Sequence, residues 1–359
     1  MSDPTPSSVS STLEYYRPLP EWAPSRPKPR YWLHILLLLA TCFTTLVMGA
    51  RMQYNFQHNR PSLSFSGDPF VDHAGQGETV PFFPAEWVRS HPERLLGGLP
   101  FMATLMLFFL AHEMGHYLYC RRYGVYATLP FFIPVPIGVG TMGAIILIRS
   151  RIRSRTALFD IGIAGPIAGF VVAVVALVIS LTWSKPMRFA LGPDDYQLGY
   201  PLIFHVLYRL LALTGLIQGP SAVPLDRMLI HPTAIAAWVG MLATSLNLLP
   251  GGQLDGGHII FSIAPRAHRI VSRLTILILL PMAYLLWLGW LVWACLLWLS
   301  SLRHPQVAEW PRVSGARIWW AAFALLMLVL TIIPAPMAHS SLREALPEPQ
   351  VVRQWLRIR

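Results

Sequence analysis

Charged residues are scarce in this chain, and their scarcity excludes an ordinary soluble protein. Only 13% of the 359 residues are charged, whereas 54% are hydrophobic, and the mean hydropathy is +0.49. A chain of this composition cannot keep most of its surface in water. We therefore expect an all-α polytopic membrane protein whose main solvent is the lipid bilayer.

Acidic residues and cysteines are also few. The 17 acidic residues are outnumbered by 28 basic ones, and the net charge is +11. The arginines cluster beside apolar segments, as the positive-inside rule expects, so the charge implies no nucleic-acid partner. The three cysteines are scattered through the chain and odd in number: Cys42, Cys120 and Cys295. This argues against a disulfide framework and against a thiolate metal site.

Long apolar segments predict about six transmembrane helices, because about 20 apolar residues are needed to cross the hydrocarbon core. They cover residues 31–49, 99–119, 157–181, 232–250, 274–302 and 318–333. Segment 274–302 fits either one tilted helix or a hairpin broken near Pro281 or Gly289. Residues 1–30 are expected to form a disordered cytosolic tail, 51–93 a loop outside the cytosol, and 338–359 a polar C-terminal tail.

A metal-site signature lies inside the second apolar segment. His112 and His116 are four residues apart, so on a helix they project from one face and can meet a single zinc ion. Glu113 stands beside them, where a carboxylate can take a proton from water and pass it to a leaving amine. These three are the only acidic, basic or histidine residues in 99–119. Because such groups are costly at bilayer depth, we interpret them as functional.

The segment after this helix is apolar but cannot form one regular helix. Residues 125–148 contain three prolines and three glycines, and arginines follow at 149, 151, 153 and 155. Irregular backbone at membrane depth survives when it is buried in protein or lines a wet cavity. We therefore predict a re-entrant loop or β-hairpin at the cytosolic side, over the metal site.

A second polar cluster ends the 232–250 segment. A catalytic zinc usually has three protein ligands, so one more is needed, and Asp255 reaches the same cytosolic end. Asp160 is the competing carboxylate, but it lies close enough to a helix end to reach the interface. His258 fits a supporting role better than that of a fourth ligand. Asn247 either satisfies freed carbonyl groups or donates to a developing oxyanion.

Together, the two clusters resemble the paired motifs of the site-2 protease family of intramembrane zinc metalloproteases. The likeness rests on HEMGH at 112–116 and NLLPGGQLDGG at 247–257, and covers roughly 99–265. It implies a transmembrane protease domain over 31–337 with its catalytic core at about 99–265. It also implies that His112, His116 and Asp255 bind Zn²⁺, that Glu113 is the base and Asn247 a supporting group, and that the substrates are transmembrane proteins. Loop 183–230 is too short for the PDZ domain that many bacterial members carry.

Three other readings stay open: a multispan metal transporter, an inactive scaffold, and a membrane zinc protease that cuts peptides outside the membrane. We expect a multi-pass protein of a cell membrane, with a bacterial inner membrane as its location and the active site toward the cytosol. The sequence leaves the oligomeric state open. For substrate binding we predict an extended backbone edge around Gly143, Ile145 and Ile146, which would pair with an unwound substrate as an added strand.

Overall fold

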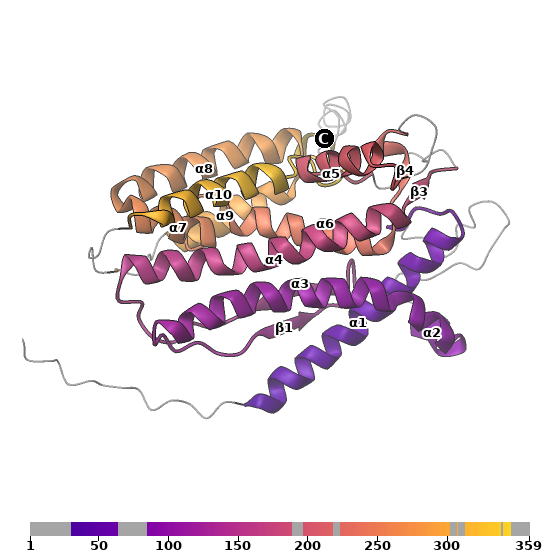
Figure 1. Cartoon of the computed structure of the whole chain (residues 1–359), viewed down its shortest axis with the longest axis horizontal. Coiled ribbons are helices and arrows are strands. Elements are labelled where there is room, and N and C mark those ends of the chain that lie inside the picture. Colours follow the sequence, from indigo (N-terminus) through magenta and orange to yellow (C-terminus); the bar gives the residue numbers. More distant parts are fainter. Residues whose placement is uncertain are drawn as a thin grey trace, which may run out of the picture.

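The computed structural model describes residues 30–63, 85–188, 197–217, 223–301, 307, 313–338 and 340–345. These parts of the chain form a helical bundle with two small antiparallel sheets (Figure 1). The expected tail over 1–30 lies outside the described residues except for Arg30, and so does most of the expected tail over 338–359.

Four of the described helices are long and apolar enough to cross a membrane. They are α1 (Tyr31–Gln57), α3 (Leu95–Arg122), α4 (Arg155–Trp183) and α8 (Pro265–Leu285). Shorter apolar helices among the described residues are α5 (Leu202–Leu213), α9 (Gly289–Ser301) and α10 (Ala316–Thr331). Helix α6 (Pro232–Asn247) is also short, with 16 residues. The helical class is confirmed, and four of about six expected spans have the required length.

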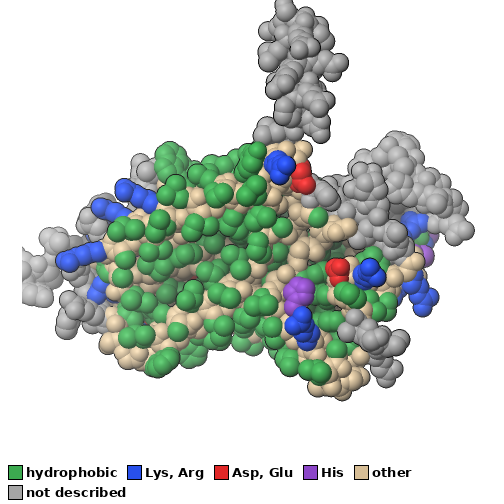
Figure 2. Space-filling view, turned by 90° about the horizontal axis from the view of Figure 1, so that it is seen from above, with side chains coloured by type: hydrophobic (Ala, Val, Ile, Leu, Met, Phe, Trp, Pro, Cys, Tyr) green, Lys and Arg blue, Asp and Glu red, His purple; other side chains and the backbone are tan. Residues whose placement is uncertain are grey.

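Hydrophobic side chains cover the broad left and central part of the face in Figure 2, with lysine and arginine at its left edge and further charged or histidine side chains toward the right. This arrangement supports association with a membrane, because lipid tails favour an apolar surface and the charged ends reach the interface. The remaining short elements are α2 (Ala85–Ser90), η2 (Pro92–Arg94), η3 (Leu225–Arg227), α7 (Asp255–Ile263), α11 (Leu342–Ala345), β3 (Lys185–Pro186) and β4 (Met228–Leu229).

The core lies between α3, α4 and α6. Its fully buried side chains include Phe101 and Phe108 of α3, Phe159 of α4 and Met241 of α6. Glycines let these helices approach closely. A Cβ at Gly115 of α3, for example, would stand only 2.5 Å from the Ala164 carbonyl oxygen of α4.

Two expectations about segment limits are corrected or narrowed by the structure. The loop expected over 51–93 is partly helical, since α1 continues to Gln57 and α2 and η2 follow. The prediction ended the first helix just before the polar residues that begin at Arg51, which was too early. A polar side chain such as Arg51 can be buried against neighbouring helices, so the helix continues. Segment 274–302 is divided at 286–288, just before Gly289, while Pro281 lies inside α8.

The Gly/Pro-rich segment contains a β-hairpin. Strand β1 (Phe131–Pro134) pairs antiparallel with β2 (Thr141–Ile145), and β1 lies between α1 and α3 in Figure 1. Thr44 of α1 donates a hydrogen bond to the Gly140 carbonyl over 2.6 Å. Gly140 has φ of +88°, and a Cβ there would stand 2.6 Å from the Thr45 Cα atom. The hairpin turn therefore fits closely against α1.

Candidate metal centre

Helix α3 presents two histidine rings from the same face. His112 and His116 are 3% and 8% exposed, and their Nε2 atoms are 3.2 Å apart. The spacing of four residues accounts for this, since it places the side chains one helical turn apart. The two ring nitrogens therefore converge on one point.

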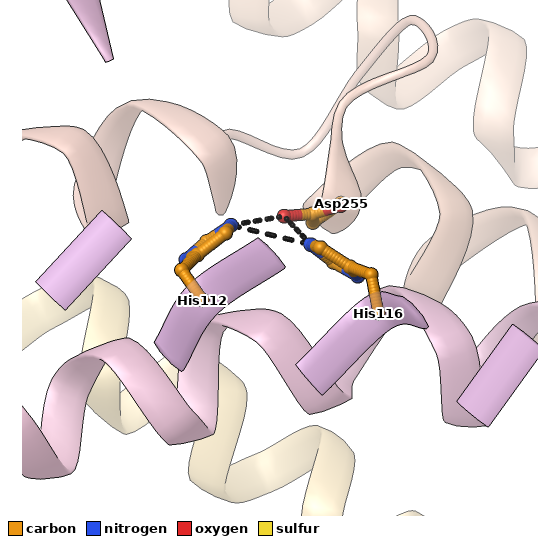
Figure 3. A group of neighbouring side chains, drawn as sticks. All are labelled: His112, His116 and Asp255. Carbon is orange, nitrogen blue, oxygen red and sulfur yellow. Dashed lines mark hydrogen bonds and ion pairs between the residues drawn. The ribbon is translucent and has the colours of Figure 1, made fainter. Parts of the chain in front are cut away.

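Asp255 reaches the same point from a distant part of the chain. It is the first residue of α7 and follows the glycine-containing loop after α6. Its Oδ2 atom lies 3.5 Å from His112 Nε2 and 3.3 Å from His116 Nε2. Figure 3 shows the carboxylate directed between the two rings, and one donor atom from each of the three residues lies within 4.8 Å of the others.

Neighbouring polar groups orient the rings. His116 Nδ1 lies 2.7 Å from the Ile161 carbonyl oxygen of α4, to which it can only donate. When this ring is neutral, its lone pair is therefore on Nε2, which faces the site, as in metal-binding histidines. On the other side, Asn247 Nδ2 lies 3.2 Å from His112 Nε2.

A face of small residues on α4 packs against both rings. A Cβ at Gly165 would stand 2.1 Å from His116 Nε2, and one at Gly169 would stand 3.2 Å from His112 Nδ1. The sequence marks these glycines only as small residues suited to helix packing. Their contact with the site depends on how α4 is aligned with α3, which the spacing of residues in either helix does not reveal.

Glu113 is buried beside the group of three but is not a member of it. It is 7% exposed, and its carboxylate accepts a hydrogen bond from the backbone N–H of Ile146. This bond connects the metal centre to the end of the β-hairpin.

The two other polar candidates from the sequence lie outside the three-residue group. Asp160 accepts two hydrogen bonds of 2.8 Å from the Arg317 guanidinium and another from the Tyr123 hydroxyl. His258 packs against α4, where a Cβ at Gly162 would stand 3.2 Å from its Cβ. The carboxylate next to the histidines is therefore Asp255.

The three predicted substrate-binding residues lie in or just after β2. Gly143 has φ of +106°, and its side faces the Phe109 ring of α3, which a Cβ would approach to 3.2 Å. Ile145 is 48% exposed. Ile146 directs its N–H to Glu113, as described above. Of the three, Ile146 contacts the site through Glu113.

The donor set fits a zinc ion. Two imidazoles and one carboxylate are nitrogen and oxygen ligands of the types that zinc accepts, and three protein ligands leave a coordination position for chemistry. The His116 ring, whose Nδ1 donates to the Ile161 carbonyl, leaves Nε2 as the nitrogen that can bind the ion.

Comparisons with known proteins agree with this chemistry. The chain is 34% identical over 167 residues to a rice (Oryza sativa subsp. indica) protein named "Probable zinc metalloprotease EGY2, chloroplastic"; the match covers 46% of this chain and 28% of that protein. It is 27% identical over 324 residues to "Probable zinc metalloprotease EGY1, chloroplastic" of Arabidopsis thaliana, covering 86% of this chain and 55% of that protein.

The matches thus span about half or less of these relatives' lengths. The sequence model described as Peptidase family M50 matches residues 100–288, which contain the two histidines, Glu113, Asn247 and Asp255. The chain belongs to Peptidase family M50.

Proposed function

We propose that this chain is a zinc-dependent endopeptidase that cuts transmembrane segments of membrane proteins. The observation that carries the proposal is the convergence of His112, His116 and Asp255, with Glu113 adjacent, between helices apolar enough to lie in a membrane. The relatives' names as zinc metalloproteases support zinc as the metal.

The polar residues of the site divide into three proposed roles. His112, His116 and Asp255 would hold zinc, which when bound supplies a Lewis acid for amide hydrolysis. Glu113 takes a proton from the attacking water on its carboxylate and delivers it to the leaving amine. Asn247 donates from its side-chain amide to the charge that develops on the carbonyl oxygen.

The β-hairpin offers a means of binding an unwound substrate. A transmembrane helix keeps its carbonyl groups in its own hydrogen bonds, and an unpaired one in hydrocarbon costs several kcal/mol. Gly143, Ile145 and Ile146 belong to a strand region paired on one side by β1, so an extended substrate could add along the other edge. Residues that lower the cost of unwinding, such as Gly or Pro, should therefore be favoured near the cut.

The Ile146 backbone tests this binding mode. Ile146→Pro removes the N–H and should lower turnover at least tenfold, while Ile146→Ala keeps it and should retain most turnover. Because the same N–H bonds Glu113, zinc content and turnover of a short unstructured peptide are measured in parallel. Strand addition predicts that a helical substrate is affected more than the short peptide. Equal losses on both substrates would assign the effect to Glu113 alone.

Other readings explain less of the site. A metal transporter has no need for a buried glutamate beside the first histidine, and a scaffold needs neither the ligands nor the base. A membrane zinc peptidase acting outside the bilayer is the second candidate. We propose a multi-pass location with the site toward the arginine-rich side; a bacterial inner membrane is the expectation from sequence, while the relatives' names refer to chloroplasts.

Glu113→Gln tests the enzyme assignment. The variant should bind zinc as the parent does, because the three ligands are kept, and should cleave a single-span substrate about 10²–10⁴-fold more slowly, because the proton acceptor is lost. Glu93→Gln is the matched control, since Glu93 is exposed in η2. Zinc content is measured by elemental analysis, and cleavage of the substrate is measured in detergent. Parental turnover by Glu113→Gln would refute the proposal.

A further inference from the structure

The loop that carries Asp255 has little structure of its own. It covers residues 248–254 between α6 and α7 and contains Gly251 and Gly252, the second with φ of +55°. Such a loop has many accessible conformations and must be fixed by contacts with other elements. Asp255 follows directly, so the position of its carboxylate depends on those contacts.

Helix α8 supplies the contacts that fix this loop, from polar side chains on one face. His268, Ser272 and Thr275 are spaced at i, i+4 and i+7, which puts them on a single face. All three are buried, at 4%, 2% and 7% exposure. Buried polar side chains are costly unless they are hydrogen-bonded, so this stripe requires partners. We call these three residues the α8 stripe.

The stripe bonds the loop backbone at two residues, Pro250 and Gly252. Thr275 Oγ1 lies 2.9 Å from the Pro250 carbonyl oxygen and 2.9 Å from the Val271 carbonyl oxygen of its own helix, so its one hydrogen is shared between them. Ser272 Oγ accepts from the Gly252 N–H over 3.2 Å, and His268 Nε2 donates to the Gly252 carbonyl over 3.0 Å. Both backbone polar groups of Gly252 are therefore bonded to α8.

The fit leaves the loop little space to move. A Cβ at Gly251 would stand 3.2 Å from the Ser272 Cα atom, and one at Gly252 would stand 2.1 Å from Ser300 Oγ of α9. Gln253 also donates from its side chain to the Ser300 carbonyl over 3.2 Å. The loop is therefore enclosed by α8 on one side and α9 on the other.

We propose that the α8 stripe is a positioning device for the metal centre: it fixes the loop backbone so that Asp255 meets the two histidines of α3. Gly252 is three residues from Asp255, and a shift of the loop would move the carboxylate by a similar distance. Ligand positions must be held to within about 0.5 Å for full affinity. The inference rests on the proposed role of Asp255 as a zinc ligand.

Two stripe variants test this with zinc affinity as the readout. His268→Ala and Thr275→Val each remove a hydrogen bond to the loop, and each should weaken zinc binding by about 10–100-fold, as loss of supporting groups commonly does. His268→Gln, which can still donate from its side-chain amide, should recover part of this loss. Affinity is measured on the full chain in detergent by competition with a chromogenic chelator.

A purely structural effect is separated by two further measurements. Thermal unfolding of the metal-free variants reports stability, and excess zinc should restore turnover to the stripe variants, because their catalytic groups are intact. The matched controls are Ile270→Ala and Leu277→Ala, at exposed positions of the same helix. Lower metal-free unfolding temperatures with parental zinc affinity would overturn the proposal, and so would equal weakening in the controls.

Asp255→Ala distinguishes failure of this inference from failure of the proposed function. If it loses zinc while both stripe variants keep parental affinity, the stripe does not position Asp255 and the inference alone fails. If Asp255→Ala also keeps parental affinity, Asp255 is no ligand and both fail. Should His268→Ala not fold, Thr275→Val gives the result, since it nearly conserves side-chain volume.

Discussion

Gly165 shows how a residue without a functional group can determine a metal centre. Its hydrogen faces the His116 ring, where a Cβ would stand 2.1 Å from Nε2. We predict that Gly165→Ala displaces this ring and lowers zinc affinity at least tenfold, with a loss of about 1–3 kcal/mol in stability from overpacking. Val175→Ala, at an exposed position of α4, is the control. Parental zinc affinity of Gly165→Ala would show that the ring can move without loss.

The two aspartates considered as the third ligand, Asp255 and Asp160, should behave oppositely. Asp255→Ala should remove zinc, since a three-ligand site depends on each member. Asp160→Asn should keep zinc and lower stability by about 1 kcal/mol, because it breaks a partly exposed ion pair with Arg317. Arg317→Gln is the matched partner variant and should lower stability by a similar amount. If Asp160→Asn lost zinc and Asp255→Ala kept it, Asp160 would be the zinc ligand instead of Asp255.

Spacing alone predicted the histidine pair, because both residues lie on one helix and the helical period fixes their relation. The choice of Asp255 over Asp160 depended on a weaker argument about distance from the interface. In the structure, the two aspartates differ because Asp160 is bonded to Arg317, which lies 157 residues away in sequence. No local pattern reveals such a partner. The α8 stripe was missed for the same reason, although polar residues at i, i+4 and i+7 in an apolar helix were a visible signal.

At the scale of elements, the crossing of α1 and α3 depends on close backbone contact. A Cβ at Gly98 of α3 would stand 2.2 Å from the Leu46 carbonyl oxygen of α1. Gly98→Ala should therefore separate the helices and destabilise the protein by about 1–3 kcal/mol. Gly97→Ala is a stringent control, because its Cβ would meet only the flexible Gln53 side chain, at 3.1 Å. Equal thermal unfolding of the two variants would contradict this account.

Prediction of elements was good where apolar runs were continuous and poor where polarity interrupted them. Helices α3 and α4 begin and end within a few residues of the expected spans. Helix α1 extends past its expected end because helical hydrogen bonds tolerate polar residues that pack on neighbours. Prolines and glycines correctly excluded a continuous helix over 125–148, while the strand pairing itself depends on contacts with α1 and α3.

At the scale of the whole molecule, the metal should tie separate parts of the bundle together. The three proposed ligands come from α3 and α7, which lie far apart in the sequence region that the family model matches. A ligand that binds only the folded state raises stability, by about 2.7 kcal/mol at 100 times its dissociation constant. Chelation should therefore lower the thermal unfolding temperature of the parent but leave that of Asp255→Ala nearly unchanged. An equal decrease in both would locate the stabilising metal elsewhere.

X-ray absorption at the zinc edge of the purified protein tests most directly the claim that His112, His116 and Asp255 hold one zinc ion. The account predicts one zinc per chain, nitrogen and oxygen ligands at about 2.0–2.2 Å, and less bound zinc and weaker imidazole scattering in His112→Ala and His116→Ala. A sulfur shell at about 2.3 Å would implicate the cysteines instead. That spectrum, or a zinc signal unchanged in the histidine variants, would contradict the assignment.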